Sequence, residues 1–288
     1  MPLLKPEIPV PGFIIDIARD MDAASRRLGL DCLIVGATAR DLLLEYARRL
    51  KPVRATTDID FAVAVADWDR FAALRDALLA TGRYDASRQA QRLIRRHDDG
   101  LTTELDIIPF AGIEDDAHDI RWPPGFETVM RVAGYADALA HAEQFQLADD
   151  LIVRIASAPG LALMKLFAWE DRRHEDDKDA VDLGILMRDY GSTLAPDRLH
   201  EEGAAEAADY NVTHASAWLL GRHCAMLASP ELHAALRRLW TEPGLRDHLI
   251  LGIANQPIID DAAGLPAESL LHHFAAGFDN GARQLSSS

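Results

Sequence analysis

Cysteine is scarce in this chain, which has only Cys32 and Cys224 among its 288 residues. Two cysteines so far apart make neither a disulfide framework nor a zinc-binding pattern, and scarce cysteine is typical of a reduced, cytoplasmic protein. Long apolar runs are also missing, because none reaches the roughly 18 residues that a membrane-spanning helix needs. The proline-rich residues 1–12 lack the apolar stretch of a signal peptide. We therefore expect a cytoplasmic protein that neither spans nor binds a membrane.

Basic residues are in deficit, because 30 lysines and arginines stand against 46 acidic residues and give a net charge of −16. Proteins that bind long nucleic acids carry a basic surplus, since their cations neutralise phosphates. The composition therefore argues against extensive non-specific binding, but it is compatible with a local patch that holds the end of a tRNA. Basic residues gather in two clusters, Arg83, Arg88, Arg92, Arg95 and Arg96, and Arg48, Arg49, Lys51 and Arg54. We interpret both clusters as solvated residues that balance the acids.

The hydrophobic content of 49% is enough for one large core or two small ones. The apolar pattern predicts helices at 13–28, 37–50 and 67–80, strands at 31–35, 58–65, 88–97, 101–109, 144–147 and 151–155, a turn at 97–100 and a loop at 111–125. From Pro159 onward the pattern is helical. We expect an α+β fold, in which a small mixed β-sheet is followed by a helical C-terminal region. The predicted domains are 1–125, the sheet with its N-terminal helix, and 126–288, a hairpin followed by helices.

The triplet Asp58-Ile59-Asp60 opens one of the predicted strands. Side chains two residues apart on a strand point the same way, so the carboxylates of Asp58 and Asp60 share one face. Neighbouring carboxylates repel each other unless a cation lies between them. Mg²⁺ prefers such oxygen ligands and adds substrate phosphates, so the pair indicates a metal-assisted site for phosphoryl or nucleotidyl transfer.

A strand, a glycine and a helix precede this triplet. The apolar residues 31–35 lead into Gly36, and a helix with a dense apolar face follows at 37–50. Such a turn offers backbone N–H groups to a phosphate, and glycine, which has no Cβ, lets a ligand approach the backbone closely. In this order, Gly36, Asp58 and Asp60 resemble the signature of the polymerase-β-like nucleotidyltransferase superfamily.

The resemblance implies a third carboxylate on a later strand. Asp106 is the candidate, because it lies inside an apolar run where an acid needs a partner; Glu104 shares its face and is the competing choice. By this resemblance Asp58, Asp60 and Asp106 are catalytic and hold Mg²⁺ or Mn²⁺. The implied reaction moves a nucleoside monophosphate from an NTP to an acceptor hydroxyl, with pyrophosphate as the leaving group.

A more specific resemblance covers roughly residues 30–190. Lys165 lies in a predicted helix, Arg172 or Arg173 follows about two turns later, and the run 178–183, Lys-Asp-Ala-Val-Asp-Leu, comes next. This order resembles the AbiEii-type toxin nucleotidyltransferases, whose pattern R-x-T-x-D-I-D also fits residues 54–60. Arg172 is preferred over Arg173 because it shares a helix face with Lys165. The resemblance implies that Lys165 is catalytic and that these residues bind the nucleotide: Gly36, Thr38, Arg40, Thr57, Arg172, Lys178, Asp179 and Asp182.

One position departs from the family pattern, which commonly has glycine or serine after the turn glycine. This chain has Ala37, which offers no hydroxyl, and Thr38 is the alternative donor. The block 39–44 also resembles the turn of poly(A) polymerases and CCA-adding enzymes, although those enzymes place the two acids closer to the glycine and lack the run at 178–183. The first reading is a toxin that modifies a tRNA 3′ end and has an antitoxin partner. The alternatives are a CCA-adding relative, a small-molecule nucleotidyltransferase, and a catalytically quiet protein that binds nucleotide or an antitoxin.

Overall fold

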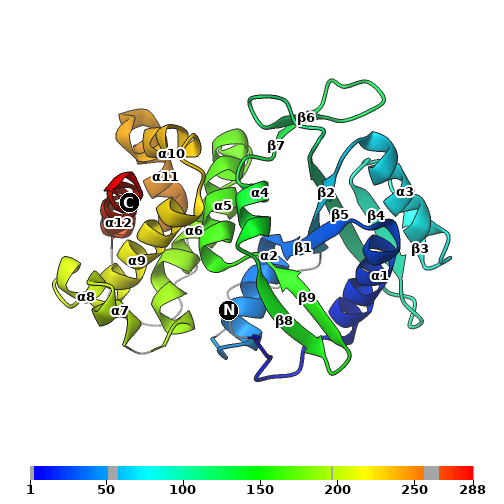
Figure 1. Cartoon of the computed structure of the whole chain (residues 1–288), viewed down its shortest axis with the longest axis horizontal. Coiled ribbons are helices and arrows are strands. Elements are labelled where there is room, and N and C mark those ends of the chain that lie inside the picture. Colours follow the sequence, from blue (N-terminus) through cyan, green and yellow to red (C-terminus); the bar gives the residue numbers. More distant parts are fainter. Residues whose placement is uncertain (1–2, 51–57, 196, 256–265, 288) are drawn as a thin grey trace. The chain divides into compact units, whose positions relative to one another are not determined.

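The computed structural model describes residues 3–50, 58–195, 197–255 and 266–287. The chain divides into two compact units, Met1–Ser157 and Ala158–Ser288 (Figure 1). The sequence placed this boundary after residue 125. It lies later because the hairpin that was expected in the second domain pairs into the sheet of the first unit. Among the helices of the described ranges, none combines the length and the apolar composition that a membrane crossing requires.

Within the described residues, seven strands of the first unit form one sheet in the order β3-β4-β5-β2-β1-β9-β8. The strands are β1 Asp31–Val35, β2 Asp58–Val65, β3 Tyr84–Ala86, β4 Arg92–Arg96, β5 Thr102–Ala111, β8 Glu143–Ala148 and β9 Leu151–Ile155, and a separate pair consists of β6 Asp119–Arg121 and β7 Val129–Arg131. Strand β2 is parallel to β5 and antiparallel to β1, whereas β1 is parallel to β9. The mixed sheet confirms the predicted α+β class, although the sheet is larger than expected.

Helix α1, Gly12–Leu28, forms because apolar residues recur at helical spacing and create one buried face. The largest residues of that face are Ile14, Ile17 and Met21. The helix ends at Gly29, whose φ of 64° is the left-handed conformation that glycine adopts readily. Helix α1 packs against α3, Trp68–Leu79, and against β1 and β9. Both helices confirm the sequence prediction.

Strand β2 separates an apolar face from an acidic one. Ile59 and Phe61 are almost fully buried, whereas Asp58 and Asp60, on the opposite face, are partly exposed. A cavity of the first unit is lined by residues of α1 together with Phe61, so α1 covers the apolar face. The two acids therefore lie on the side of the sheet away from α1.

Several segments differ from the sequence prediction. The predicted loop 111–125 contains β6, and β3 was not expected, because three residues are too few to show a clear alternation. The helix predicted at 37–50 is shorter: α2 spans Gly36–Asp41, and a π-helical turn follows at Leu42–Tyr46. A six-residue helix, α4, follows the β6–β7 pair at Tyr135–Ala140.

The second unit is helical in its described residues, as the sequence predicts from Pro159 onward. Its helices are α5 Ala158–Arg172, α6 Lys178–Asp189, α7 Arg198–Glu201, α8 Ala204–Ala207, α9 Val212–Leu227, α10 Leu232–Thr241, α11 Pro243–Ala254 and α12 Ala267–Ser287, with a 3₁₀ turn at Tyr190–Thr193. Helices α9 and α12 touch through their backbones. A Cβ at Gly277 would lie 2.6 Å from the carbonyl carbon of Trp218, and one at Gly221 would lie 2.8 Å from that of Phe274. Glycine at both positions permits this close approach.

Candidate active site

One row of the sheet register carries the candidate site. Asp60 of β2 lies opposite Val35 of β1 on one side and opposite Asp106 of β5 on the other. Asp106 in turn lies opposite Arg92 of β4. Directly opposed residues point to the same face of a sheet, and Asp58 joins that face two residues before Asp60. One carboxylate oxygen from each of Asp58, Asp60 and Asp106 lies within 4.8 Å of the other two.

Three carboxylate oxygens at this separation form a donor set for a hard divalent cation. Mg²⁺ takes oxygen ligands, and carboxylates this close repel each other without a cation. Among the described residues this is the one group of histidine, cysteine and acidic side chains with such spacing. Asp106 belongs to the group and the competing Glu104 does not. The residues present therefore fit the Mg²⁺ or Mn²⁺ that the resemblance implies.

Gly36 and Thr38 shape the start of β2 and the position of its acids. Gly36 has a φ of 65°, and a Cβ there would lie 2.8 Å from Cγ of Asp60 and closer still to its Oδ2. The glycine thus makes room for the Asp60 carboxylate, which the sequence did not indicate. The buried Thr38 hydroxyl donates to the backbone carbonyl of Asp58 over 3.2 Å. The hydroxyl that the sequence offered to a phosphate is engaged with the strand that carries the acids.

Arg92 is the residue of this site that the sequence reasoning missed. Its Nε donates to Oδ1 of Asp106 and its Nη2 donates to Oδ2, each over 2.7 Å. Its Nη1 pairs with the carboxylate of Glu104. The hydrogen bonds that Arg92 donates to Asp106, and then the charges of Asp106, Glu104 and Asp58, raise the pKa of the Arg92 guanidinium above its ordinary value. Arg92 is therefore a permanent cation inside a group of acids.

The hairpin between β4 and β5 contains the signal that locates Arg92. Its ladder is centred on Asp99, so that Arg92, seven residues before it, faces Asp106, seven residues after it. A tight turn fixes the register of its hairpin. The predicted strand ends at residues 97 and 101 share this centre, so the register counted from them places Arg92 opposite Asp106.

Arg40 and Thr57 are the other candidates in the first unit. Arg40 is buried, and its Nε and Nη2 donate to Oδ1 of Asp41 over 2.9 and 2.6 Å. Its charge is thus partnered by the neighbouring acid of the same helix. Thr57, together with Arg54 and Thr56 of the same motif, lies outside the described residues.

Lys165 of α5 meets Asp179 and Asp182 of α6 in the second unit. Its Nζ lies 2.9 Å from Oδ1 of Asp179 and 2.7 Å from Oδ2 of Asp182. Burial acts to lower the pKa of Lys165, but the two carboxylates outweigh it and raise the pKa above its ordinary value. Burial acts to raise the pKa of Asp179, but Lys165 and Arg172 outweigh it and lower the pKa. The pKa shifts of Lys165 and Asp179 therefore favour the charged form of both groups.

Arg172 belongs to this cluster, and Arg173 does not. Nη2 of Arg172 donates to Oδ2 of Asp179 over 2.6 Å, in keeping with the helix face that Arg172 shares with Lys165. Arg173 instead donates to a backbone carbonyl of its own helix. Lys178 lies at the exposed start of α6, where its Nζ is 3.2 Å from a neighbouring acid.

Four of the five arginines in the first basic cluster predicted from the sequence pair with acids, and Arg92 has been described above. Arg83 and Arg95 both contact the carboxylate of Asp20 on α1, and Arg96 contacts Asp85 of β3. Arg95 and Arg96 thereby connect β4 to α1 and β3, and Arg83, which directly precedes β3, connects to α1. These contacts support the interpretation that the arginines balance acids. The three side chains therefore do not form an open cationic surface.

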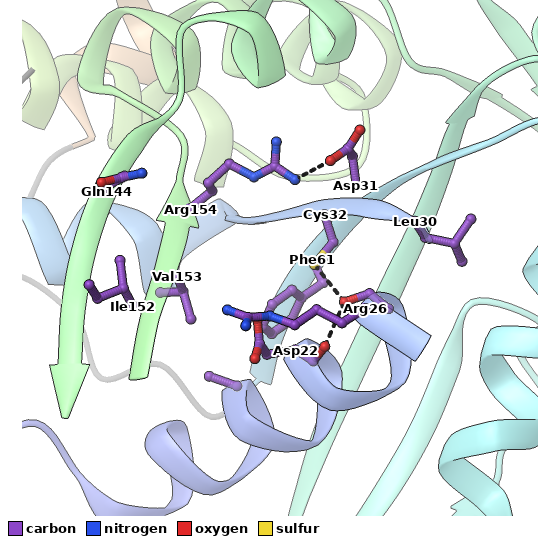
Figure 2. Close-up of a pocket in the computed structure, with 12 residues that line it drawn as sticks. Asp22, Arg26, Leu30, Asp31, Cys32, Phe61, Gln144, Ile152, Val153 and Arg154 are labelled. Atoms are coloured by element: carbon purple, nitrogen blue, oxygen red, sulfur yellow. Dashed lines mark hydrogen bonds and ion pairs between the residues drawn. The ribbon is translucent and has the colours of Figure 1, made fainter. Parts of the chain in front are cut away.

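A cavity of about 560 Å³ lies on the other face of the sheet, between α1 and the strands β1 and β9 (Figure 2). Its two arginines are already paired, Arg26 with Asp22 over 2.8 Å and Arg154 with Asp31 over 2.5 Å. Burial raises the pKa of the Cys32 thiol, which disfavours the reactive thiolate. These groups do not point to a bound phosphate, so the carboxylate face remains the candidate site.

No protein-family model and no curated protein sequence matches this chain. Solved structures similar to it include an antigenic nucleotidyltransferase-like protein from Paracoccidioides brasiliensis, with 17% identity, coverage of 78% of this chain and 90% of that one, and a TM-score of 0.41. The antibiotic-resistance factor ANT(2'')-Ia has 14% identity, coverage of 56% and 75%, and a TM-score of 0.32. The CCA-adding enzyme of Thermotoga maritima, complexed with tRNA, has 12% identity, coverage of 100% and 85%, and a TM-score of 0.27. Likeness at this level does not assign a function, which is therefore inferred from the site itself.

Proposed function

We propose that this protein is a metal-dependent nucleotidyltransferase, which moves a nucleoside monophosphate from an NTP to an acceptor hydroxyl. The observation that carries the proposal is the register row that sets Asp60 beside Asp106, with Asp58 on the same face. Three acids suit a triphosphate only when cations neutralise the repulsion between carboxylates and phosphates. The order of Gly36, the acid pair and the later acid along the chain supports the same reaction class.

Asp58, Asp60 and Asp106 would hold Mg²⁺ or Mn²⁺ through their carboxylate oxygens. When bound, such ions orient a triphosphate, lower the pKa of an acceptor hydroxyl and stabilise the charge of an in-line displacement at the α-phosphorus. The contribution of the chain is to keep the three carboxylates on one rigid face, since β2 is paired on both sides, by β1 and β5. Rigid placement matters because small displacements of reacting groups reduce rates strongly.

We also assign Lys165 to the binding of the nucleotide phosphates. Arg172, Lys178, Asp179 and Asp182 are its supporting residues. An ammonium has three N–H donors, and Asp179 and Asp182 lie within reach of two of them. The remaining donor is the one that we assign to a phosphate. In the first unit the assigned nucleotide-binding residues are Gly36, Thr38, Arg40 and Thr57.

The proposed acceptor is the 3′ end of a tRNA, and the proposed role is that of a toxin with an antitoxin partner. This finer assignment rests on the AbiEii-like order of the motif residues between 54 and 182. The pairing of Arg83, Arg95 and Arg96 with acids supports recognition of a short RNA end over an extended RNA surface.

A catalytically quiet protein that binds nucleotide or an antitoxin is the second candidate. Two observations favour it. Ala37 supplies no hydroxyl after the turn glycine, and the Thr38 hydroxyl is engaged by the carbonyl of Asp58.

Incubation with each labelled NTP, Mg²⁺ and total tRNA, followed by electrophoresis of the RNA, tests the proposed transfer. We expect labelled tRNA with at least one NTP, no label in EDTA, and a loss of about a hundredfold or more with Asp60→Asn, which keeps the shape but removes the charge. Asp85→Asn, which changes an exposed acid of β3, is the matched control and should retain activity. NTP binding that is equal in Mg²⁺ and EDTA, with no label on tRNA or on small-molecule hydroxyls, would instead identify the quiet protein.

A further inference from the structure

The Arg92–Asp106 pair places a permanent cation on a residue that we assign to the metal. Nε and Nη2 of Arg92 donate to the two oxygens of Asp106, each over 2.7 Å. Both oxygens that a metal would use therefore face a guanidinium. Two cations on one carboxylate repel each other, so the ion pair with Arg92 disfavours binding of a metal to Asp106, and a bound metal disfavours the ion pair.

The charges on this face of the sheet are unequal. Asp58 lies opposite Glu104, and Asp60 lies opposite Asp106, so four carboxylates occupy neighbouring positions on two parallel strands. Arg92 contacts Glu104 and Asp106 and supplies one positive charge to this group. Four neighbouring carboxylates attract divalent cations, and Arg92 is a cation that competes for two of them.

Arg92 has a second acidic partner besides Asp106. It is the first residue of β4, directly after the turn residues 87–91, and its side chain is 23% exposed. Its Nη1 already pairs with Glu104, whose side chain is 47% exposed. The guanidinium can therefore leave Asp106 and keep an acidic partner.

We propose that Arg92 and the divalent metal exchange at Asp106: the metal displaces the guanidinium, which stays on Glu104 and there contacts the phosphates of the incoming NTP. Arg92 is then a positioning residue for Asp106 in the metal-free protein and a phosphate ligand in the loaded one. The inference rests on the proposed metal-dependent function. It also predicts that metal and NTP bind cooperatively, because the NTP takes up the guanidinium that the metal releases.

Titration of the full chain with Mn²⁺, followed by electron paramagnetic resonance without nucleotide, tests the exchange. Arg92→Gln should bind Mn²⁺ about tenfold or more tighter than the wild type, in proportion to the charge-assisted hydrogen bonds removed. Arg92→Lys should bind Mn²⁺ with an intermediate gain, because an ammonium keeps the charge but cannot form the two-pronged contact with Asp106. Arg96→Gln is the matched control, since Arg96 lies on the same strand but pairs with the exposed Asp85, and its Mn²⁺ affinity should equal that of the wild type.

Several results would overturn the exchange. If Arg92→Gln binds Mn²⁺ no tighter than the wild type, Arg92 does not compete with the metal for Asp106. Arg92 would then hold the Asp106 carboxylate in the orientation that binds the metal. If the Mn²⁺ affinity of Arg92→Lys equals that of the wild type while Arg92→Gln binds Mn²⁺ more tightly, the positive charge alone opposes the metal. The paired contact of the guanidinium with both Asp106 oxygens would then have no part in the exchange. The rise in melting temperature on adding Mn²⁺ gives a second readout, and it should be larger for both Arg92 variants than for the wild type. Absence of Mn²⁺ binding in the wild type and in every variant would overturn the metal site itself, and with it the proposed function.

Discussion

Gly36 and Gly29 have nearly the same positive φ, 65° and 64°, but they have different surroundings. Nothing lies within 4 Å of a Cβ built on Gly29, whereas one on Gly36 meets the Asp60 carboxylate. The two glycines therefore separate the cost of a left-handed conformation from the cost of displacing a site residue.

We expect Gly29→Ala to lower the free energy of unfolding by about 1 kcal/mol, the cost of the left-handed backbone alone. Gly36→Ala should lower it by about 2–3 kcal/mol, because the new methyl group also displaces the Asp60 side chain. It should also weaken Mn²⁺ binding about tenfold or more, since one of three charged ligands moves. Urea denaturation and Mn²⁺ titration of both variants measure these effects. Wild-type Mn²⁺ affinity in Gly36→Ala would remove Asp60 from the ligand set.

Single residues were predictable from the sequence where their partners are close along the chain. Asp58 and Asp60 are two residues apart on one strand, so their shared face follows from strand geometry alone. Arg92 was grouped with solvated arginines because its partner, Asp106, is reached only across the β4–β5 ladder. The register of a hairpin has to be counted before such a pair can be recognised.

At the scale of secondary-structure elements, Lys165 joins α5 to α6. Its side chain is 15% exposed, and those of Asp179 and Asp182 are 4% and 3% exposed. The resemblance seen in the sequence assigned this lysine to catalysis. The structure also makes it the partner of two buried carboxylates.

We expect Lys165→Met to lower the free energy of unfolding by about 3–5 kcal/mol, because it removes the ammonium that both buried carboxylates contact. Lys178→Met is the matched control: Lys178 is 62% exposed and its pair with Asp176 lies at the surface, so the change should cost less than about 1 kcal/mol. Denaturant unfolding at neutral pH compares the two variants. Equal stabilities would mean that the Lys165 cluster does not hold α5 and α6 together.

The pKa shifts in the Lys165 cluster predict how the difference in unfolding free energy between wild type and Lys165→Met changes with pH. The folded-state pKa of Asp179 is lowered, so its contribution to stability is present above its unfolded pKa of about 3.9 and is lost as the pH falls through the lower folded value. The pKa of Lys165 is raised, so its contribution is present below its unfolded pKa of about 10.4 and is lost as the pH rises through the higher folded value. The stability gap between wild type and Lys165→Met should therefore be widest near neutral pH and shrink in acid. A gap that stays constant from neutral pH into acid would contradict the assignment.

Elements were predictable when they were long enough to show a period. Strands β1 and β2 were predicted with the bounds that the structure has, whereas the three-residue strands β3, β6 and β7 were not. The hairpin of β8 and β9 was predicted, but its place in the sheet was not, because β9 pairs with β1 from the opposite end of the first unit. Neighbours that are distant in sequence leave no local pattern.

At the scale of the whole molecule, the net charge of −16 acts against every polyanionic partner. Arg83, Arg95 and Arg96 are paired with acids in the first unit, so they offer phosphates less charge than their number suggests. Any binding of RNA would therefore have to come from specific contacts.

We expect labelled poly(U) to bind more weakly than about 100 μM at 0.15 M salt, the weak end of non-specific binding. A tRNA should bind more tightly, and its affinity should fall only shallowly as salt is raised, because few phosphates are contacted. Fluorescence anisotropy over a range of salt concentrations measures both. Micromolar poly(U) binding with a steep salt dependence would show that the basic clusters form an RNA surface.

The position of β2 between β1 and β5 also bears on how the chain is made on the ribosome. Synthesis completes β1 and β2 by residue 65, but the strand that covers the other edge of β2 follows only at residues 102–111. Until then that edge is open, and an open, apolar strand edge is a template for pairing with other chains. Asp58 and Asp60 place two negative charges beside that edge, and charges of this kind discourage such pairing. We therefore expect the acids that we assign to the metal also to discourage aggregation of the nascent chain, before the site they belong to exists.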